Sequence, residues 1–137
     1  MNYDPSTINP LLKPIGIILS ALKRLEDCPL QERESDTEAE LLISPEFADG
    51  IADLKPGDKI VLLTWMHLAD RNELKTQPRN NINAPFTGVF STRSPNRPNP
   101  IGLHQVTVLS VADNLVKVSG LEVLDQTPLI DIKPVIG

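Results

Sequence analysis

Residues 90–102, FSTRSPNRPNPIG, combine a stiff backbone with many polar side chains. Three prolines each fix their own φ angle and push the preceding residue towards an extended conformation. The missing N–H groups of these prolines exclude the segment from the interior of a β-sheet. Because such a loop has little conformational entropy left to lose, it can hold side chains ready for a ligand. The polar side chains that it displays are Thr92, Arg93, Ser94, Asn96, Arg97 and Asn99.

These side chains suit a ligand that carries an anion and an amide-like group. An arginine guanidinium is a planar fork that pairs with carboxylate or phosphate, and the loop carries Arg93 and Arg97. An asparagine offers a donor and an acceptor together, which suits an amide or a base edge. Asn96 and Asn99 either serve a ligand in this way or hold the shape of the loop itself. The alternative for the whole segment is a rigid connector whose polar groups satisfy the local backbone.

The charge distribution points to the same part of the chain. The net charge is −5, which argues against a generic nucleic-acid coat. Residues 1–73 hold 14 acids and 7 bases, whereas residues 74–112 hold four bases and no acid. This acid-free window predicts a local positive surface that attracts a phosphate or a carboxylate, unless the charges cluster there by chance.

Several classes of protein are excluded by what the sequence lacks. It has no G-x-G-x-x-G, no P-loop, no G-x-S-x-G and no H-E-x-x-H motif. Two histidines and one cysteine are too few for a zinc site, so we expect no metal. The single Cys28 cannot close a disulfide within the chain, no apolar run approaches the roughly 20 residues of a membrane span, and the N-terminus does not resemble a signal peptide. We therefore expect a cytoplasmic protein that does not cross a membrane.

The elements that must position the loop are short and mostly extended. After an irregular lead-in over residues 1–14, one short helix is predicted from Pro45, with Ser44 as its cap and Gly50 as its end. Residues 25–37 and 71–86 are predicted to be long loops. Apolar and β-branched runs predict strands at 15–20, 38–43, 59–65, 87–92, 103–112, 115–120 and 129–133.

The predicted strands carry apolar residues on both faces, which bears on how the sheet closes. Such a pattern favours a closed or half-closed barrel, or a sheet with one face in an oligomer interface. We predict one domain over residues 1–137, mainly all-β: a small, mostly antiparallel β-barrel with one short helix and long loops.

Three segments together resemble a known family. GVFSTRSPNRPNPIGL (88–103), LEVLDQTPLIDIKPVI (121–136) and VLLTWMHLADR (61–71) are similar to the signatures of the TsaA-like domain family, also called YaeB-like or TrmO-like. The first match is specific because it is contiguous and unusual in composition. The resemblance extends from about Ile15 to Ile136.

The resemblance implies a small β-barrel that binds S-adenosylmethionine and works as a homodimer with the cofactor near the interface. The best-known family activity is methylation of the N6-threonylcarbamoyl adenosine next to the anticodon of tRNA. Family members that act on tRNA carry an additional C-terminal domain, whereas this chain ends at Gly137, so less of a tRNA-binding surface is expected. Leu30 stands where the family often has an arginine, so one ligand contact is expected to be lost. Methylation of a small molecule and a non-catalytic cofactor-binding module are the alternatives.

Methyl transfer from a sulfonium is an in-line displacement, so the protein mainly aligns donor and acceptor and excludes water. Arg93 or Arg97 is predicted to bind the carboxylate of the methionine part. Phe90, Leu124 and the backbone of residues 125–127 are predicted to hold the adenine. The predicted cofactor-binding set is Phe90, Thr92, Arg93, Ser94, Asn96, Arg97, Asn99, Leu124, Asp125 and Thr127.

The predicted catalytic set is His67, Asp131 and Lys133. His67 is either a base that accepts the proton of the acceptor or a structural histidine. Asp131 and Lys133, two residues apart on a predicted strand, share a face and either orient the acceptor or form a plain ion pair. Two further side chains near these segments are expected to be structural: Trp65 in the core, and His104, which is expected to be exposed or structural.

Overall fold

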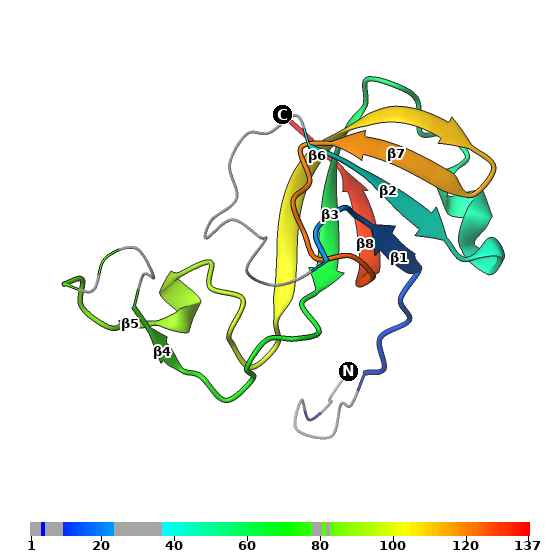
Figure 1. Cartoon of the computed structure of the whole chain (residues 1–137). Coiled ribbons are helices and arrows are strands. Elements are labelled where there is room, and N and C mark those ends of the chain that lie inside the picture. Colours follow the sequence, from blue (N-terminus) through cyan, green and yellow to red (C-terminus); the bar gives the residue numbers. More distant parts are fainter. Residues whose placement is uncertain (1–3, 5–9, 24–36, 78–80, 82) are drawn as a thin grey trace.

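A computed structural model describes residues 4, 10–23, 37–77, 81 and 83–137. Within these ranges, six strands close into an antiparallel barrel in the order β1-β2-β7-β6-β3-β8 (Figure 1). Pairing of β1 with β8, with Gly16 opposite Leu129, completes the closure. The barrel strands are β1 (Gly16–Leu19), β2 (Glu38–Ile43), β3 (Lys59–Trp65), β6 (Ile101–Ala112), β7 (Leu115–Ser119) and β8 (Thr127–Pro134). The predicted mainly-β barrel is confirmed.

The barrel is held by alternate apolar residues that point inwards. In β3, for example, Ile60 and Leu62 are buried, whereas the residues that follow each of them, Val61 and Leu63, are half-buried. Burial of such aliphatic side chains is the main favourable contribution to folding. Fully buried members of the core are Ile18, Leu41, Ile43, Ile60, Leu62, Val108, Val116, Val118, Leu121 and Leu129. Residues 10–14 are irregular and exposed, as predicted for the lead-in.

The predicted strand over 87–92 is wrong beyond its first two residues. β5 (Thr87–Gly88) pairs with β4 (Lys75–Thr76), and Val89–Ser91 then forms a 3₁₀ turn, η4. Val89 is buried and its N–H donates to the Leu74 carbonyl, so the chain is anchored there and turns away. β4 also lies inside the segment that was predicted to be a structureless loop.

The predicted short helix exists as a 3₁₀ helix, η3 (Pro45–Ile51). Pro45 occupies the predicted first position, but the side chain of Ser44 makes no capping hydrogen bond. The helix continues past Gly50 because Ile51 is buried against the barrel core. No helix among the described residues is long and apolar enough to span a membrane. Cys28, Leu30 and most of the predicted loop at 25–37 lie outside those residues.

The described residues between β3 and β6 leave the barrel as a separate projection, which we call the lobe (residues 66–77, 81 and 83–100). Figure 1 shows it to one side of the barrel, with β4, β5 and η4 at its outer part. Trp65 pairs with Ile101 at its base, and the Met66 N–H donates to the Pro100 carbonyl at 2.8 Å. The stiff loop seen in the sequence therefore belongs to this lobe and is attached to the barrel through two paired strands.

Replacing Gly16 by alanine tests the tight pairing that closes the barrel. An added Cβ at Gly16 would collide with the backbone carbonyl oxygen of Leu42, which cannot move without opening the β1–β2 ladder. We expect Gly16→Ala to lower the free energy of unfolding by about 1–3 kcal/mol, as overpacking does.

Urea denaturation followed by circular dichroism measures this effect. Gly50→Ala is the matched control, because nothing lies within 4 Å of an added Cβ there. It should change the free energy of unfolding by less than about 0.5 kcal/mol. Equal stability of the two variants would show that the β1–β2 pairing is looser than described.

Candidate functional site

One end of the barrel collects the buried polar side chains. Among the described residues these are Ser20, Thr64, His104 and Thr127. All lie where β1 and β3 finish and where β6 and β8 begin, which is also where the lobe leaves the barrel. We call this the polar end. Because a buried polar group is costly unless it is hydrogen-bonded, such a concentration indicates a function or a specific structural lock.

Thr64 and His104 form one buried polar pair at this end. Thr64 Oγ1 and His104 Nε2 lie 3.0 Å apart, at hydrogen-bond distance. Gly102 makes room for them, since a Cβ there would come within 2.6 Å of His104 Nε2 and 3.3 Å of Met66 Sδ. His104 is therefore structural, one of the two predicted possibilities.

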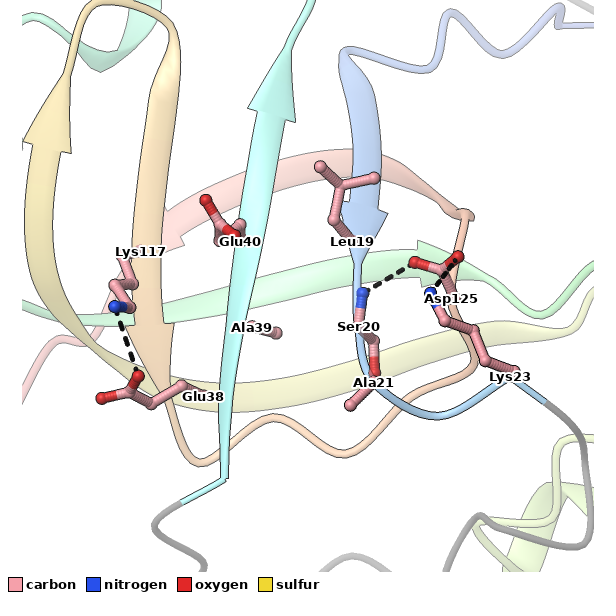
Figure 2. Close-up of a pocket in the computed structure, with 9 residues that line it drawn as sticks. All are labelled: Leu19, Ser20, Ala21, Lys23, Glu38, Ala39, Glu40, Lys117 and Asp125. Carbon is pink, nitrogen blue, oxygen red and sulfur yellow. Dashed lines mark hydrogen bonds and ion pairs between the residues drawn. The ribbon is translucent and has the colours of Figure 1, made fainter.

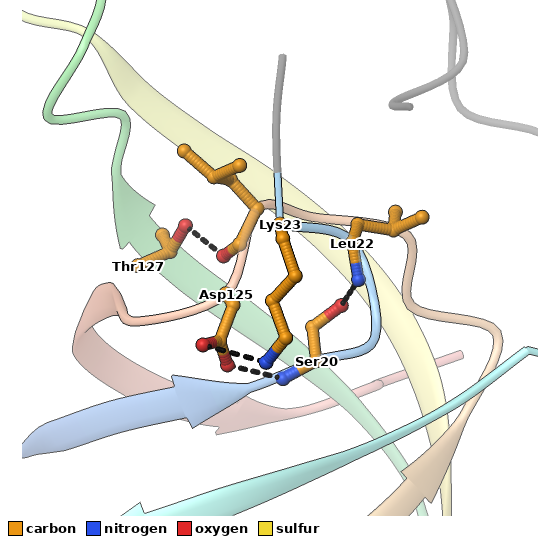
Figure 3. Close-up of polar contacts among 6 residues, drawn as sticks. Ser20, Leu22, Lys23, Asp125 and Thr127 are labelled. Atoms are coloured by element: carbon orange, nitrogen blue, oxygen red, sulfur yellow. Dashed lines mark hydrogen bonds and ion pairs between the residues drawn. The ribbon is translucent and has the colours of Figure 1, made fainter. Parts of the chain in front are cut away.

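Asp125 ties the end of β1 to the turn before β8. Its carboxylate accepts from the Ser20 N–H at 2.8 Å and pairs with Lys23 Nζ at 2.9 Å (Figure 3). The Asp125 and Gln126 N–H groups donate to the carbonyls of Leu22 and Ile18, each at 2.6 Å. The Ser20 N–H and then the Lys23 ammonium hold the pKa of the Asp125 carboxyl below its usual value. Asp125 is therefore a fixed negative charge at neutral pH.

A hollow of about 530 Å³ opens beside this carboxylate (Figure 2). Its volume is in the range of small-molecule sites. Two ion pairs border it, Lys23 with Asp125 and, across the hollow, Lys117 with Glu38 at 3.4 Å. The lining residues are Leu19, Ser20, Ala21, Lys23, Glu38, Ala39, Glu40, Lys117 and Asp125.

The second predicted segment reaches this end through Leu124 and Thr127. Both are buried, and the Thr127 hydroxyl donates to the Leu124 carbonyl at 2.6 Å (Figure 3). This bond shapes the turn, so the Thr127 hydroxyl is already engaged by the protein. Sequence reasoning missed Ser20 and Lys23, because their link to Asp125 spans about a hundred residues and no local motif marks it.

Arg97 holds the loop's own backbone. One of its terminal nitrogens donates to the Thr92 carbonyl at 2.9 Å and to the Ser94 carbonyl at 3.1 Å. Its guanidinium carbon also lies 6.0 Å from the centre of the Phe90 ring, at cation–π distance. Phe90 itself is 77% exposed, so its ring is available to a ligand as well as to Arg97.

The two asparagines also contribute to the loop's shape. Asn96 Oδ1 accepts from the Asp70 N–H at 2.9 Å. Asn99 Oδ1 lies 3.4 Å from a terminal nitrogen of Arg71, whose Nε donates to the Pro98 carbonyl at 2.7 Å. The oxygen of each amide is thus engaged within the protein. The alternative in which the asparagines hold the loop is the one that the geometry favours.

Arg93 differs from Arg71 and Arg97, the other arginines of the lobe that the structure describes. It is exposed, and it makes no hydrogen bond or ion pair with any residue that the structure describes. Arg97 and Arg71 are both committed to loop carbonyls. Of these three arginines, Arg93 is the one whose guanidinium can pair with an incoming anion without breaking a described protein contact.

The predicted catalytic residues are not brought into one cluster. His67 is exposed at the start of the lobe, without a hydrogen bond to the described residues. Asp131 and Lys133 form an ion pair at 3.3 Å on β8, with side chains that are 46% and 62% exposed. Trp65 is half-buried and so is not part of the buried core as predicted, and the Arg71 guanidinium lies over its ring, 5.0 Å from the ring centre.

Removing the charge of Asp125 tests how much the polar end depends on it. We expect Asp125→Asn to lower the free energy of unfolding at pH 7 by about 1–2 kcal/mol, through loss of a charge-assisted bond and an ion pair. Because the pKa of Asp125 is lowered in the folded state, this stabilisation is present above the usual carboxyl pKa of about 4 and is lost as the pH falls below it.

Urea denaturation at pH 7 and pH 3 measures the difference, with Asp53→Asn, an exposed aspartate outside this cluster, as the control. The free energies of unfolding of the natural protein and of Asp125→Asn should be closer at pH 3 than at pH 7. A gap that is the same at both pH values would contradict the assignment.

Comparison with known proteins places these features in a family. Residues 17–137 match the model of the tRNA-methyltransferase O N-terminal domain. A probable S-adenosyl-L-methionine-binding protein of Methanothermobacter thermautotrophicus is 43% identical over 123 residues, covering 90% of this chain and 88% of that protein. An S-adenosyl-L-methionine-binding protein of Archaeoglobus fulgidus is 45% identical over 123 residues, covering 90% of this chain and 87% of that protein.

Solved structures of TrmO resemble this chain as well. A crystal structure of TrmO from Pseudomonas aeruginosa superposes with a TM-score of 0.76 and 27% identity, covering 97% of this chain and 57% of that one. Another crystal structure of TrmO gives a TM-score of 0.73 and 28% identity, covering 94% of this chain and 58% of that one. This chain therefore spans somewhat over half the length of the solved chains that it matches. The resemblance found in the sequence is confirmed: the chain belongs to the TrmO N-terminal domain family.

Proposed function

We propose that this protein binds S-adenosylmethionine through the loop at 90–102 and the polar end of the barrel, and transfers the methyl group of this cofactor to an acceptor. The observation that carries the proposal is the state of the loop at 90–102. Arg97, Asn96 and Asn99 are locked into the loop, while Arg93 is displayed without a protein partner among the described residues. The curated relatives, which carry binding of this cofactor in their names, support the same choice of ligand.

Residues of the lobe and of the polar end suit the separate parts of the cofactor. The Arg93 guanidinium would pair with the carboxylate of its methionine part. The exposed ring of Phe90 and the buried Leu124 would give the adenine apolar contacts, with backbone groups of residues 125–127 as hydrogen-bond partners. Asp125 adds a negative charge that suits an ammonium or a sulfonium.

In catalysis the protein would align the cofactor with the acceptor and provide a group that takes the acceptor's proton. The bound cofactor supplies an already activated methyl group, so the chain need not provide a nucleophile of its own. An amine or amide acceptor loses a proton, and the exposed imidazole of His67 is the group that we assign to take it. Because Asp131 and Lys133 neutralise one another in a half-exposed ion pair, we assign them to positioning the acceptor.

The acceptor that we propose is the N6 group of threonylcarbamoyl adenosine in tRNA, as the matched family model and the TrmO structures suggest. The basic, acid-free window at 74–112 favours an anionic partner at the lobe. A second candidate is a module that binds the cofactor without acting on tRNA. The net charge of −5 and the names of the curated relatives favour this alternative.

We further propose that the protein is a homodimer that meets its copy through the outer face of β3, β6 and β8. Leu103 and Ile101 on this face are 49% and 46% exposed, and they pair with the outward-facing Leu63 and Trp65. Asp131 of β8 lies opposite Leu63 of β3 and forms an ion pair with Lys133. Charges of both signs therefore lie at the edge of this face. Such an edge is complementary to itself across a two-fold axis.

Substitution of Arg93 tests the proposed cofactor site. Calorimetric titration of S-adenosylmethionine should show binding to the natural protein, and Arg93→Gln should weaken it about tenfold or more through loss of a desolvated charge pair. The matched control is Lys75→Gln, an exposed cation of the same lobe, which should bind as the natural protein does. If Arg93→Gln bound with unchanged affinity, the carboxylate would have to lie elsewhere.

Transfer of a labelled methyl group separates the two candidate functions. With tRNA from a strain that lacks this modification, incorporation of label should depend on His67 and should fall at least tenfold in His67→Gln. Cofactor binding by calorimetry should be unchanged in that variant. Cofactor binding without any transfer to tRNA would leave the non-catalytic module as the better description.

Light scattering after gel filtration tests the dimer. We expect twice the mass of one chain, and we expect Leu103→Glu to give single chains because it places a charge in an apolar contact. Gln105→Glu, exposed on the same face of β6, is the control and should remain dimeric. A natural protein with the mass of one chain would overturn the proposed dimer.

A further inference from the structure

Arg71 joins the end of the barrel strand β3 to the stiff loop of the lobe. In the sequence it is only the last residue of VLLTWMHLADR (61–71) and shows no sign of this role. Its guanidinium lies over the Trp65 ring, 5.0 Å from the ring centre. The same group donates from Nε to the Pro98 carbonyl at 2.7 Å and lies 3.4 Å from Asn99 Oδ1. One side chain therefore links the end of β3 to the stiff loop, and Arg71 itself is 27 residues from Pro98 in the chain.

The backbone around Arg71 follows the same loop. Asn96 Oδ1 accepts from the Asp70 N–H at 2.9 Å, and Asp70 Oδ1 accepts from the Asn72 N–H at 2.8 Å. The segment at 66–72 thus forms a cradle for residues 96–100. Arg71 is a member of this cradle that also contacts the barrel strand, because Trp65 is the last residue of β3.

Arg93 has no such support. It lies in the loop only through its backbone, and its side chain contacts no described residue by a hydrogen bond or an ion pair. The direction in which it points depends on how the loop sits on the cradle. The three prolines make the loop stiff, so a change at 98–99 is passed along to residue 93 instead of being absorbed.

We propose that Arg71 is a positioning residue that fixes the loop against Trp65 and thereby presents Arg93 to the carboxylate of the cofactor. This inference rests on the proposed function. The planar fork of arginine explains the residue type, because it stacks on an aromatic face while its Nε and terminal nitrogen bind two acceptors. Lysine has neither the plane nor the second donor direction.

The role differs from a general contribution to stability. None of the groups that Arg71 contacts belongs to the barrel core, whose members lie on the inner faces of the strands. Loss of these contacts should leave the barrel folded while the loop samples several positions. If about one molecule in ten then holds the loop correctly, the dissociation constant rises about tenfold.

Calorimetric titration with S-adenosylmethionine tests the proposal in Arg71→Lys and Arg71→Gln. We expect about tenfold weaker binding in both, with an unfolding midpoint in urea close to that of the natural protein. Lys75→Gln, an exposed charge on the same lobe, should change neither quantity. Absence of binding by the natural protein would refute the proposed function itself, whereas binding by Arg71→Lys at natural affinity would refute only the positioning role.

A double substitution separates positioning from any direct contact. If Arg71 acts through Arg93, Arg71→Lys should have little further effect on affinity in an Arg93→Gln background. A full tenfold loss in that background would overturn the proposal.

Trp65 provides an independent readout because it is the only tryptophan in the chain. Its emission should change in Arg71→Lys without the cofactor present, since the cation leaves the ring face. An unchanged emission spectrum would show that Arg71 does not rest on Trp65 in solution.

Discussion

A loop with three prolines cannot be held by a ladder of its own backbone hydrogen bonds, and the architecture of the site follows from that constraint. Side chains take over the task. The N–H groups of Ser94 and Asn96 donate to the hydroxyls of Thr92 and Ser94, and Arg97 closes the turn through two carbonyls. The loop's unusual composition is therefore largely explained by its need to fix itself. What remains after this accounting is Arg93, and a displayed cation on a stiff support is the element that structural need does not explain.

The barrel supplies the second half of the site by a different physical route. Its inner surface is aliphatic along most of its length and becomes polar only where β1 and β3 finish. There the Asp125 carboxylate accepts from the Ser20 N–H and pairs with Lys23, and the Asp125 N–H donates to the Leu22 carbonyl. These contacts fasten the turn before β8 to the end of β1, the strand that closes the barrel. A rigid closed barrel thus provides a base for both the turn at 121–127 and the lobe. Two segments that are distant in sequence come to the same end because antiparallel neighbours alternate in direction.

The fold could largely be predicted because its signals are local. Runs such as KIVLLTW and EAELLI show alternating or continuous apolar character, and both became strands with the predicted limits. The exception at 87–92 has a tertiary cause, since burial of Val89 and its bond to Leu74 outweigh β propensity. Closure of the barrel required the family resemblance as well, because apolar faces alone also allowed an open sheet.

The candidate site was predicted less completely, for reasons that lie in long-range geometry. The loop stood out through its composition, but nothing local distinguishes Arg93 from Arg97; only the contacts of each guanidinium do so. Ser20 and Lys23 lie in no quoted motif, and Arg71 only ends one; the bonds of Ser20 to Asp125 and of Arg71 to Pro98 span 105 and 27 residues. The sequence also left both histidines with alternative roles; the structure places His104 in a buried pair and His67 on the surface, and the role of His67 stays a prediction.

The division between barrel and lobe also gives the charge pattern a physical meaning. All the acids lie in the parts of the chain that precede and follow residues 74–112, and the four bases of that window lie between residues 75 and 97. At physiological ionic strength the field of such a lobe reaches about 8 Å, so it acts on an anion close to the loop and not at long range. An acidic body with a basic projection is thus compatible with an anionic ligand at one place and with repulsion of anions elsewhere. The two regions also differ in how their charges are held: at the polar end Lys23 pairs with Asp125 and Lys117 with Glu38, whereas Arg93 on the lobe has no ion-pair partner among the described residues.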